Sequence, residues 1–234
     1  MICAGCGAWT DEPRVLADGA GTALLCVSCG HRELYRRLPL FALTGPSGTG
    51  KTTVGRLLAE SLSDVAVVLE QDLLWVDALR DPTGDSAAFR QTWLRLAASI
   101  HQSGRPVVLC GTVAPPQFEP WPERVLFSDI HYLALTCAQN ELAARLRARP
   151  AWRAWDEPRI KEMLGFNKWI QSEAAHTVPP MSLLDTTMMS PQQTAVKAEA
   201  WVRGLVVVAT QGTKQRQRHK QGTQSRTSRT SSQQ

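Results

Sequence analysis

The stretch Gly45-Pro46-Ser47-Gly48-Thr49-Gly50-Lys51-Thr52 fits the pattern G-x-x-x-x-G-K-[ST] without a departure. An apolar run precedes it at Leu38–Thr44, and apolar residues at helical spacing follow it in Lys51–Leu62. Glycines permit backbone angles that turn successive N–H groups into such a loop, and the following helix adds its N-terminal amides. The stretch therefore predicts a phosphate-binding loop between a strand and a helix.

The residue types of this loop also predict its ligand. Lys51 is spaced to reach the β- and γ-phosphates of a nucleotide, and the hydroxyl of Thr52 to bind Mg²⁺. We therefore expect ATP with Mg²⁺ as the ligand. The predicted nucleotide-binding residues are Gly45, Pro46, Ser47, Gly48, Thr49, Gly50, Lys51, Thr52 and Thr53.

Short apolar runs alternate with helical patterns along the middle of the chain. Strands are expected at 38–44, 65–69, 106–110, 130–135 and 182–184, and helices at 51–62, 86–101, 138–148, 157–173 and from Ser190 onward. This order predicts an α/β P-loop NTPase fold with a five-stranded, mostly parallel sheet and helices on both faces. Ligands bind at the carboxyl ends of such strands. The segment from Thr112 to Pro122 is rich in proline and is expected to lack regular structure.

The second and third of these strands end in different kinds of residue. The third ends in Cys110-Gly111-Thr112, without the carboxylate that a mechanical or signalling NTPase carries there. The second ends in Glu70-Gln71-Asp72, and residues two apart on an extended segment face the same way. We expect both carboxylates to point into the cleft. The alternative role for Asp72 is a helix N-cap.

With this loop and this acidic pair, the chain resembles the small-molecule and nucleotide kinases of the P-loop class over roughly Leu38 to Val208. That class includes shikimate kinase, gluconate kinase, chloramphenicol phosphotransferase and the nucleoside-monophosphate kinases, and an AAA-type ATP-binding domain is expected on the same grounds. The resemblance implies that Asp72 holds the acceptor hydroxyl, acts as its base or helps to position Mg²⁺. Nucleoside-monophosphate kinases carry an aspartate in the third-strand motif, where this chain has Cys110.

An arginine-rich segment, with Arg145, Arg147, Arg149 and Arg153, follows the fourth strand. In the kinases named above, a lid after this helix brings arginines onto the transferring phosphates, and planar guanidinium groups suit that charge. The resemblance therefore implies a catalytic role for Arg149 and Arg153 beside Lys51 and Asp72. A solvated arginine face is the alternative, and for Arg145 the two interpretations are balanced.

The N-terminal segment carries two C-x-x-C-G turns, Cys3–Gly7 and Cys26–Gly30. Nineteen residues separate the two pairs, which fits the spacing of a four-cysteine zinc site. Four thiolates close a tetrahedral shell, so the expected Zn²⁺ is structural, with Cys3, Cys6, Cys26 and Cys29 as its ligands. The segment resembles a zinc ribbon over about Met1 to Tyr35. Its role is left open, and Trp9 and Arg14 are its only obvious candidates for a contact surface.

The charge of the chain is unevenly distributed. Six of its 26 Lys and Arg residues lie in the last 26 residues, which hold no acidic residue, and removing them leaves 20 basic against 21 acidic residues. This balance does not favour a nucleic-acid surface over the whole protein. We expect a disordered basic tail at 209–234, since that segment is almost without apolar residues. No stretch resembles a membrane span or a secretory signal, and a cytoplasmic location is expected.

Together these features predict a zinc ribbon at 1–37, a P-loop kinase-like domain at 38–208 and the tail at 209–234. The predicted function is an ATP-dependent phosphotransferase that acts on a small hydroxyl-bearing compound, a nucleoside or a nucleotide. The alternatives are a nucleic-acid-associated ATPase, which would use the ribbon and the tail, and a protein that binds ATP for interaction alone. The acceptor and the oligomeric state are not determined by the sequence.

Overall fold

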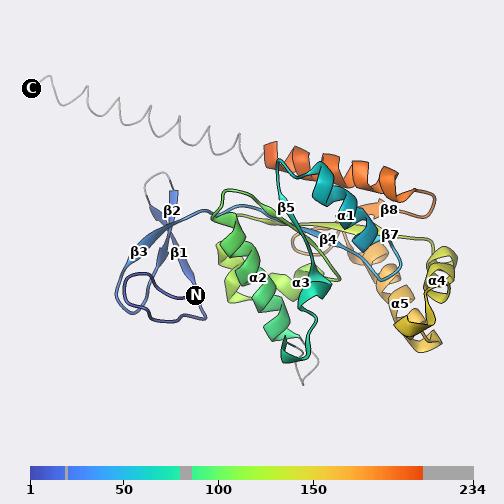
Figure 1. The fold of residues 1–234 in the computed structure, drawn as a ribbon, viewed down its shortest axis with the longest axis horizontal. Coiled ribbons are helices and arrows are strands. Elements are labelled where there is room, and N and C mark those ends of the chain that lie inside the picture. Colours follow the sequence, from blue (N-terminus) through green and yellow to red (C-terminus); the bar gives the residue numbers. More distant parts are fainter. Residues whose placement is uncertain (19–20, 80–85, 208–234) are drawn as a thin grey trace, which may run out of the picture. The chain divides into compact units, whose positions relative to one another are not determined.

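The computed structural model describes residues 1–18, 21–79 and 86–207, and its ribbon is drawn in Figure 1. Met1–Glu199 form one compact unit. A second unit starts at Ala200, and its described residues, 200–207, are helical. The tail predicted at 209–234 lies outside the described residues. Within the described part of the chain, no helix is both long and apolar enough to cross a membrane.

A small antiparallel sheet holds the N-terminal segment together. Its strands are β1 (Arg14–Asp18), β2 (Gly21–Leu25) and β3 (Arg32–Tyr35), in the order β1-β2-β3. One cysteine turn lies before β1, where Ile2 and Trp9 form a bridge, and the other joins β2 to β3. The sheet thus brings together two turns that are far apart in the sequence.

The main sheet has five strands, all of which pair in parallel. They are β4 (Leu40–Thr44), β5 (Val67–Glu70), β6 (Val107–Cys110), β7 (Ile130–Thr136) and β8 (Ser182–Asp185), in the order β5-β6-β4-β7-β8. The central strand β4 leads into the glycine-rich loop. Because the strands are parallel, their carboxyl ends meet at one edge, where ligands bind in such sheets.

Helices cover both faces of this sheet, as Figure 1 shows, with α1 on one side and α2 and α5 on the other. The main helices are α1 (Lys51–Ser61), α2 (Ala87–His101), α4 (Gln139–Arg147) and α5 (Glu157–Glu173). Leu40 and Ala42 of β4 share a buried core with Trp93 of α2 and Ile170 of α5. Ser190 caps a last helix that begins at residue 191, since its hydroxyl accepts the Gln193 N–H at 3.2 Å.

One expectation about regular structure is wrong. The proline-rich segment contains the short helix α3 (Pro115–Phe118), and a 3-10 helix, η3, follows at Pro122–Leu126. Each helix has a proline in its first turn, where the fixed φ of proline suits the helix and its missing N–H costs nothing. The side chain of Gln117 also accepts the N–H of Ala114 at 2.8 Å, which closes the start of α3.

Candidate active site and metal centre

The glycine-rich loop follows β4 and ends at the start of α1. Gly45 and Gly48 have positive φ angles of 131° and 96°. A side chain on Gly45 would meet the backbone oxygen of Leu135 in β7, and one on Gly48 would meet Leu142 of α4. Glycine is therefore required at both positions, because the loop lies directly against β7 and α4.

Lys51 is the first residue of α1, and its side chain turns back into this loop. Its Nζ donates to the carbonyl oxygens of Gly45, at 2.6 Å, and Pro46, at 3.0 Å. Burial lowers the pKa of Lys51 to about 8, although the carboxylates of Asp72 and Glu70 favour its charged form. A partly buried ammonium group that donates to two carbonyl oxygens is a site that an anion would stabilise.

A cavity of about 140 Å³ opens beside Lys51. Its walls come from the glycine-rich loop, the ends of β5 and β6, and the segment after α4. They consist of Ser47, Gly48, Gly50, Lys51, Thr52, Thr53, Glu70, Asp72, Gly111, Thr112, Arg149 and Arg153. The structure thus brings together most of the predicted site residues. Gly45, Pro46 and Thr49 lie behind them and shape the loop, since Thr49 Oγ1 donates to the Pro46 carbonyl at 2.9 Å.

The two carboxylates reach the cavity by a route that the strand pattern did not predict. β5 ends at Glu70, and Asp72 lies in the 3-10 helix η1 (Gln71–Leu74), so the two residues do not share an extended segment. The position before η1 is Glu70, which makes no capping hydrogen bond, so Asp72 is not an N-cap. Burial raises the pKa of Glu70, and a hydrogen bond from Thr52 acts in the opposite direction.

The four arginines divide into two pairs. Arg145 binds Glu141 at 2.9 Å and the carbonyl oxygens of Thr186 and Thr187 at 3.2 Å, so it ties α4 to the loop after β8. Arg147 forms a two-bond ion pair with Glu157, at 2.7 and 2.8 Å. Both are thus engaged in contacts within the fold.

Arg149 and Arg153 differ from that pair because both line the cavity. Their guanidinium groups lie over the rings of Trp155, at 5.2 Å, and Trp152, at 4.8 Å. Burial and then the nearby charge of Arg153 lower the pKa of Arg149. A bound anion would relieve this repulsion, which is what a phosphate-binding arginine pair requires.

Sequence reasoning gave no role to three residues that shape the cavity. Gly111 and Thr112 line it, and Thr112 Oγ1 donates to the Gly45 carbonyl at 3.4 Å. The side chain of Gln71, only 4% exposed, fills the space beside the Cα of Gly111, where no larger residue would fit. Their place in the sequence could have indicated this role, because Gln71 directly follows β5 and the other two directly follow β6.

These residues fit a nucleotide polyphosphate with a divalent cation. The loop offers the ammonium of Lys51, and Arg149 and Arg153 add positive charge to the lining of the same cavity. The hydroxyl of Thr52 and the carboxylates of Glu70 and Asp72 are the hard oxygen ligands that Mg²⁺ accepts. The chemistry of this set therefore suits the predicted ligands.

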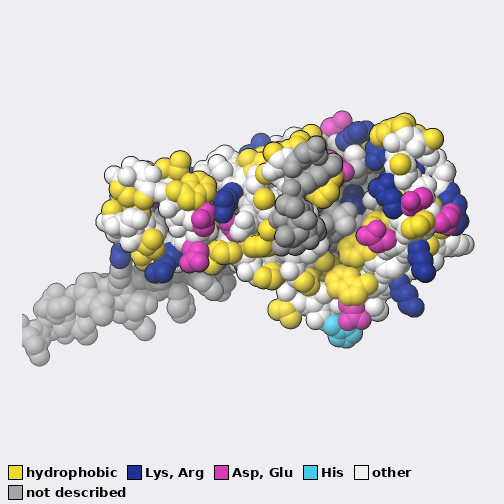
Figure 2. Space-filling view, turned by 90° about the horizontal axis from the view of Figure 1, so that it is seen from below, with side chains coloured by type: hydrophobic (Ala, Val, Ile, Leu, Met, Phe, Trp, Pro, Cys, Tyr) yellow, Lys and Arg dark blue, Asp and Glu magenta, His cyan; other side chains and the backbone are white. Residues whose placement is uncertain are grey.

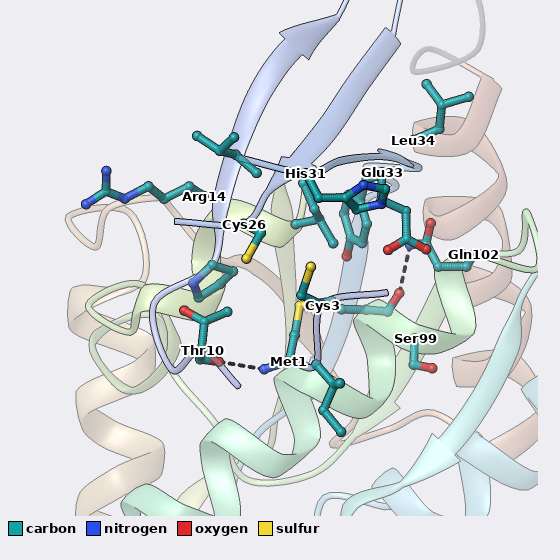
Figure 3. Close-up of a pocket in the computed structure, with 16 residues that line it drawn as sticks. Met1, Cys3, Thr10, Arg14, Cys26, His31, Glu33, Leu34, Ser99 and Gln102 are labelled. Carbon is teal, nitrogen blue, oxygen red and sulfur yellow. Dashed lines mark hydrogen bonds between the residues drawn. The ribbon is translucent and has the colours of Figure 1, made fainter. Parts of the chain in front are cut away.

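The cysteine turns form a second site, part of which is seen in Figure 3. The four sulfur atoms lie within 4.8 Å of one another, and the Cys3–Cys29 and Cys6–Cys26 pairs are each 3.8 Å apart. A tetrahedron with metal–sulfur bonds of about 2.3 Å has edges of about 3.8 Å. Gly7 and Gly30, at φ 72° and 73°, close the two turns. The cluster is therefore compatible with one zinc ion.

The electrostatics of the cluster also favour a cation. Hydrogen bonds from the N–H groups of Cys29 and Ser28 lower the pKa of Cys26 to about 6. The His31 N–H favours the thiolate of Cys29, but the sulfurs around it raise its pKa to about 12. Adjacent thiolates repel one another, and a bound dication removes that repulsion. By contrast, Cys110 and Cys137 are buried in the main unit.

Comparison with known proteins identifies the class of this fold. Residues 42–163 match the AAA domain family, so the chain belongs to that family. The matched range includes the glycine-rich loop, the acidic pair and the arginine segment. A search of curated proteins found no match.

Among solved structures, a candidate kinase from Chloroflexus aurantiacus shares the fold, with a TM-score of 0.50 and 20% identity over 74% of this chain and 98% of that chain. A gluconokinase from Sinorhizobium meliloti 1021 has a TM-score of 0.49 and 20% identity, covering 75% and 98%. A sugar kinase from Janibacter sp. HTCC2649 has a TM-score of 0.48 and 17% identity, covering 72% and 95%. The predicted P-loop fold with a parallel five-stranded sheet is confirmed.

The lowered pKa of Lys51 predicts that nucleotide binding weakens as the pH rises. An anion raises this pKa on binding, so above pH 8 binding must take up a proton, and below pH 8 the ammonium is already formed. Since only about a tenth of the amine is charged one pH unit above its pKa, ADP affinity should fall about tenfold between pH 7.5 and 9. Isothermal titration calorimetry at the two pH values measures the ADP affinity.

Two variants serve as controls for this pH dependence. Lys51→Met should bind ADP weakly and equally at both pH values, whereas Lys161→Met, on the exposed side of α5, should behave like the unaltered protein. An ADP affinity in the unaltered protein that does not change between pH 7.5 and 9 would contradict the role of the Lys51 ammonium.

Proposed function

We propose that this protein is an ATP-dependent phosphotransferase that phosphorylates a small hydroxyl-bearing compound, a nucleoside or a nucleotide. The observation that carries this proposal is the position of Asp72. Its carboxylate lines the same cavity as Lys51 and the two arginines, while β6 ends in Cys110 instead of an acidic residue. A carboxylate beside the phosphate loop suits an acceptor hydroxyl, and the gluconokinase and sugar kinase with which this chain was compared are named for such acceptors.

In this proposal the residues of the chain act by position and charge. Lys51 and the loop N–H groups bind the phosphates, and Asp72 orients the acceptor hydroxyl and takes its proton as the oxygen bonds to the γ-phosphorus. The bond from that phosphorus to the ADP oxygen then breaks. Arg149 and Arg153 neutralise the charge on the transferred group.

Mg²⁺ would neutralise phosphate charge when bound. Thr52, with its hydroxyl at the start of α1, and Glu70 are its proposed ligands, directly or through water. Burial and then the nearby charge of Asp72 raise the pKa of Glu70, and a bound dication would favour its charged form.

The rival function is a nucleic-acid-associated ATPase that uses the ribbon and the basic tail. On the face seen in Figure 2, Lys and Arg side chains gather mainly over the end that carries α4 and α5, where acidic side chains lie among them. Trp9, the ribbon's candidate for stacking on a base, instead lies under the guanidinium of Arg95 at 5.3 Å. The mixed charges at that end and the stacking of Arg95 on Trp9 favour the kinase over the nucleic-acid-associated ATPase.

A panel of acceptors separates the two functions. We expect ATP turnover, measured as the release of ADP, to depend on one class of hydroxyl compound in a panel of nucleosides, nucleotides, sugar acids and hydroxylated antibiotics. Mass spectrometry should find the phosphorylated product. If single-stranded RNA or DNA raises turnover and no member of the panel gains a phosphate, the kinase proposal fails.

Replacing Asp72 tests its proposed role directly. Asp72→Asn keeps the shape of the side chain and removes the base, so phosphotransfer should fall by about 10²-fold or more. ADP affinity should stay within about twofold, because Lys51 and the loop are unaltered. Glu60→Gln, an exposed position of α1, is the matched control and should leave both quantities unchanged. Full transfer activity in Asp72→Asn would remove Asp72 from the mechanism.

We also propose that the cysteine cluster holds one structural Zn²⁺ through Cys3, Cys6, Cys26 and Cys29. The geometry and the crowded thiolates support this ligand set. Elemental analysis should find about one zinc per chain, and Cys6→Ser should lower that content by about half or more, since a three-sulfur site binds zinc more weakly. Cys137→Ala, a buried cysteine outside the cluster, should retain the full content. A metal-free protein with intact thiols after expression in zinc would contradict the assignment.

A cytoplasmic location fits both proposed sites. Phosphotransfer from ATP needs a compartment that supplies it, and thiolates that bind a metal persist where thiols stay reduced. Fluorescence of a tagged protein would check this.

A further inference from the structure

The helix α2 is tied to the ribbon by Arg95. The guanidinium of Arg95 binds Glu123 of η3 at 2.7 and 2.8 Å, approaches Asp11 of the ribbon at 3.6 Å and lies over the Trp9 ring at 5.3 Å. Glu123 is only 1% exposed, so this ion pair fixes Arg95 in place. One side chain of α2 therefore joins the ribbon to the part of the same unit that is built on the main sheet.

A second tie lies at the end of the same helix. The Gln102 side chain, just after α2, accepts the Arg36 N–H at 2.9 Å and donates to the Arg36 carbonyl at 3.2 Å. Tyr35, the last residue of β3, is 5% exposed and belongs to the core that holds Phe89 and Trp93 of α2. Figure 3 shows Ser99 of α2 and Gln102, just after α2, beside the cavity that Cys3 and Cys26 also line. The metal site and α2 are thus neighbours.

The other contacts of α2 reach the turn that carries Asp72. The Trp93 indole N–H donates to the Gln71 carbonyl at 3.1 Å, and both residues are buried. Phe89 meets Trp75, just after η1, edge to face at 4.9 Å. The residue before Asp72 and a residue after it are therefore both held by α2.

From these contacts we propose that α2 connects the metal-bound ribbon to the acceptor side of the active site, with Trp93 as a positioning residue for Asp72. A ribbon of this size has no core of its own and folds around its metal. Loss of the metal releases Trp9, Asp11 and Arg36 from α2, and α2 then holds the Gln71 carbonyl less firmly. The phosphate loop and α4 make none of these contacts among the described residues, so nucleotide binding is spared. The catalytic consequence rests on the proposed function.

Hydrogen exchange tests the connection without any assay of activity. Mass spectrometry compares the zinc-loaded protein with the same protein after a chelator has removed the zinc under reducing conditions. After chelation, amides in 71–76 and 87–102 should exchange about fivefold faster or more, while those in 139–147 of α4 keep their rates. Unchanged rates in 71–76 and 87–102 would overturn the proposal. Equal acceleration that includes 139–147 would also overturn it, because the ribbon would then support the whole fold.

A pair of tryptophan variants tests Trp93 in the zinc-loaded protein. Trp93→Phe keeps a buried ring and removes the indole N–H. Trp121→Phe is the matched control, since the Trp121 indole N–H also donates to a backbone carbonyl, that of Gln117, at 2.9 Å. Exchange in 71–76 should rise in Trp93→Phe alone. With the acceptor that the panel identifies, its kcat should fall about tenfold, with the KM for ATP unchanged.

A change on the ribbon itself completes the test. Trp9→Ala removes the ring under Arg95 and leaves the ion pair between Arg95 and the buried Glu123 intact. It should accelerate exchange in 87–102 at full zinc content. If zinc loss and these variants alter exchange as expected but no compound is phosphorylated, the proposed function fails and the connection stands. If Trp93→Phe and Trp121→Phe behave alike in exchange and in kcat, Trp93 has no positioning role.

Discussion

The inward-turned ammonium group of Lys51 is the constraint on which the cavity at the carboxyl edge of the sheet depends. Its Nζ is surrounded by loop carbonyls because the loop turns inward at glycines with positive φ. The same turn brings Gly45 against the backbone of β7 and Gly48 against α4. The position of the charge therefore also sets the distance from the loop to the helix that leads into the arginine segment.

The arginines of that segment differ in the kind of group that their guanidinium groups contact. Arg145 and Arg147 bind the carboxylates of Glu141 and Glu157, and their charges are used within the fold. Arg149 and Arg153 lie on tryptophan rings and face the cavity. An aromatic face orients a guanidinium without neutralising it, so these two arginines keep their capacity for a phosphate. Partner type therefore separates the two pairs.

The sequence was most informative where local rules decide the structure. The helix predicted at 157–173 has those bounds, because Asp156 caps it and Pro158 suits its first turn. Local rules failed where packing between distant segments decides. The strand pattern predicted that Glu70 and Asp72 face the same way because both lie on one extended segment. In the structure Asp72 lies in a 3-10 helix instead. The indole of Trp93, 22 residues after Gln71 in the chain, holds that helix at the Gln71 carbonyl. The roles of Gly111 and Gln71 depend on the pairing of β5 with β6. No spacing in the sequence reveals that pairing.

The proposed metal site gives a physical reason why the small ribbon and the larger fold would depend on each other. Three short strands bury little apolar surface, and the best buried of their side chains, Ala23 and Tyr35, include one that lies in the core of the main unit. In the proposed zinc-bound ribbon, part of the free energy of metal binding would order Tyr35 and Trp9 against α2. Because α2 also holds the Gln71 carbonyl beside Asp72, we infer that a stabilised ribbon would narrow the range of positions open to the Asp72 carboxylate.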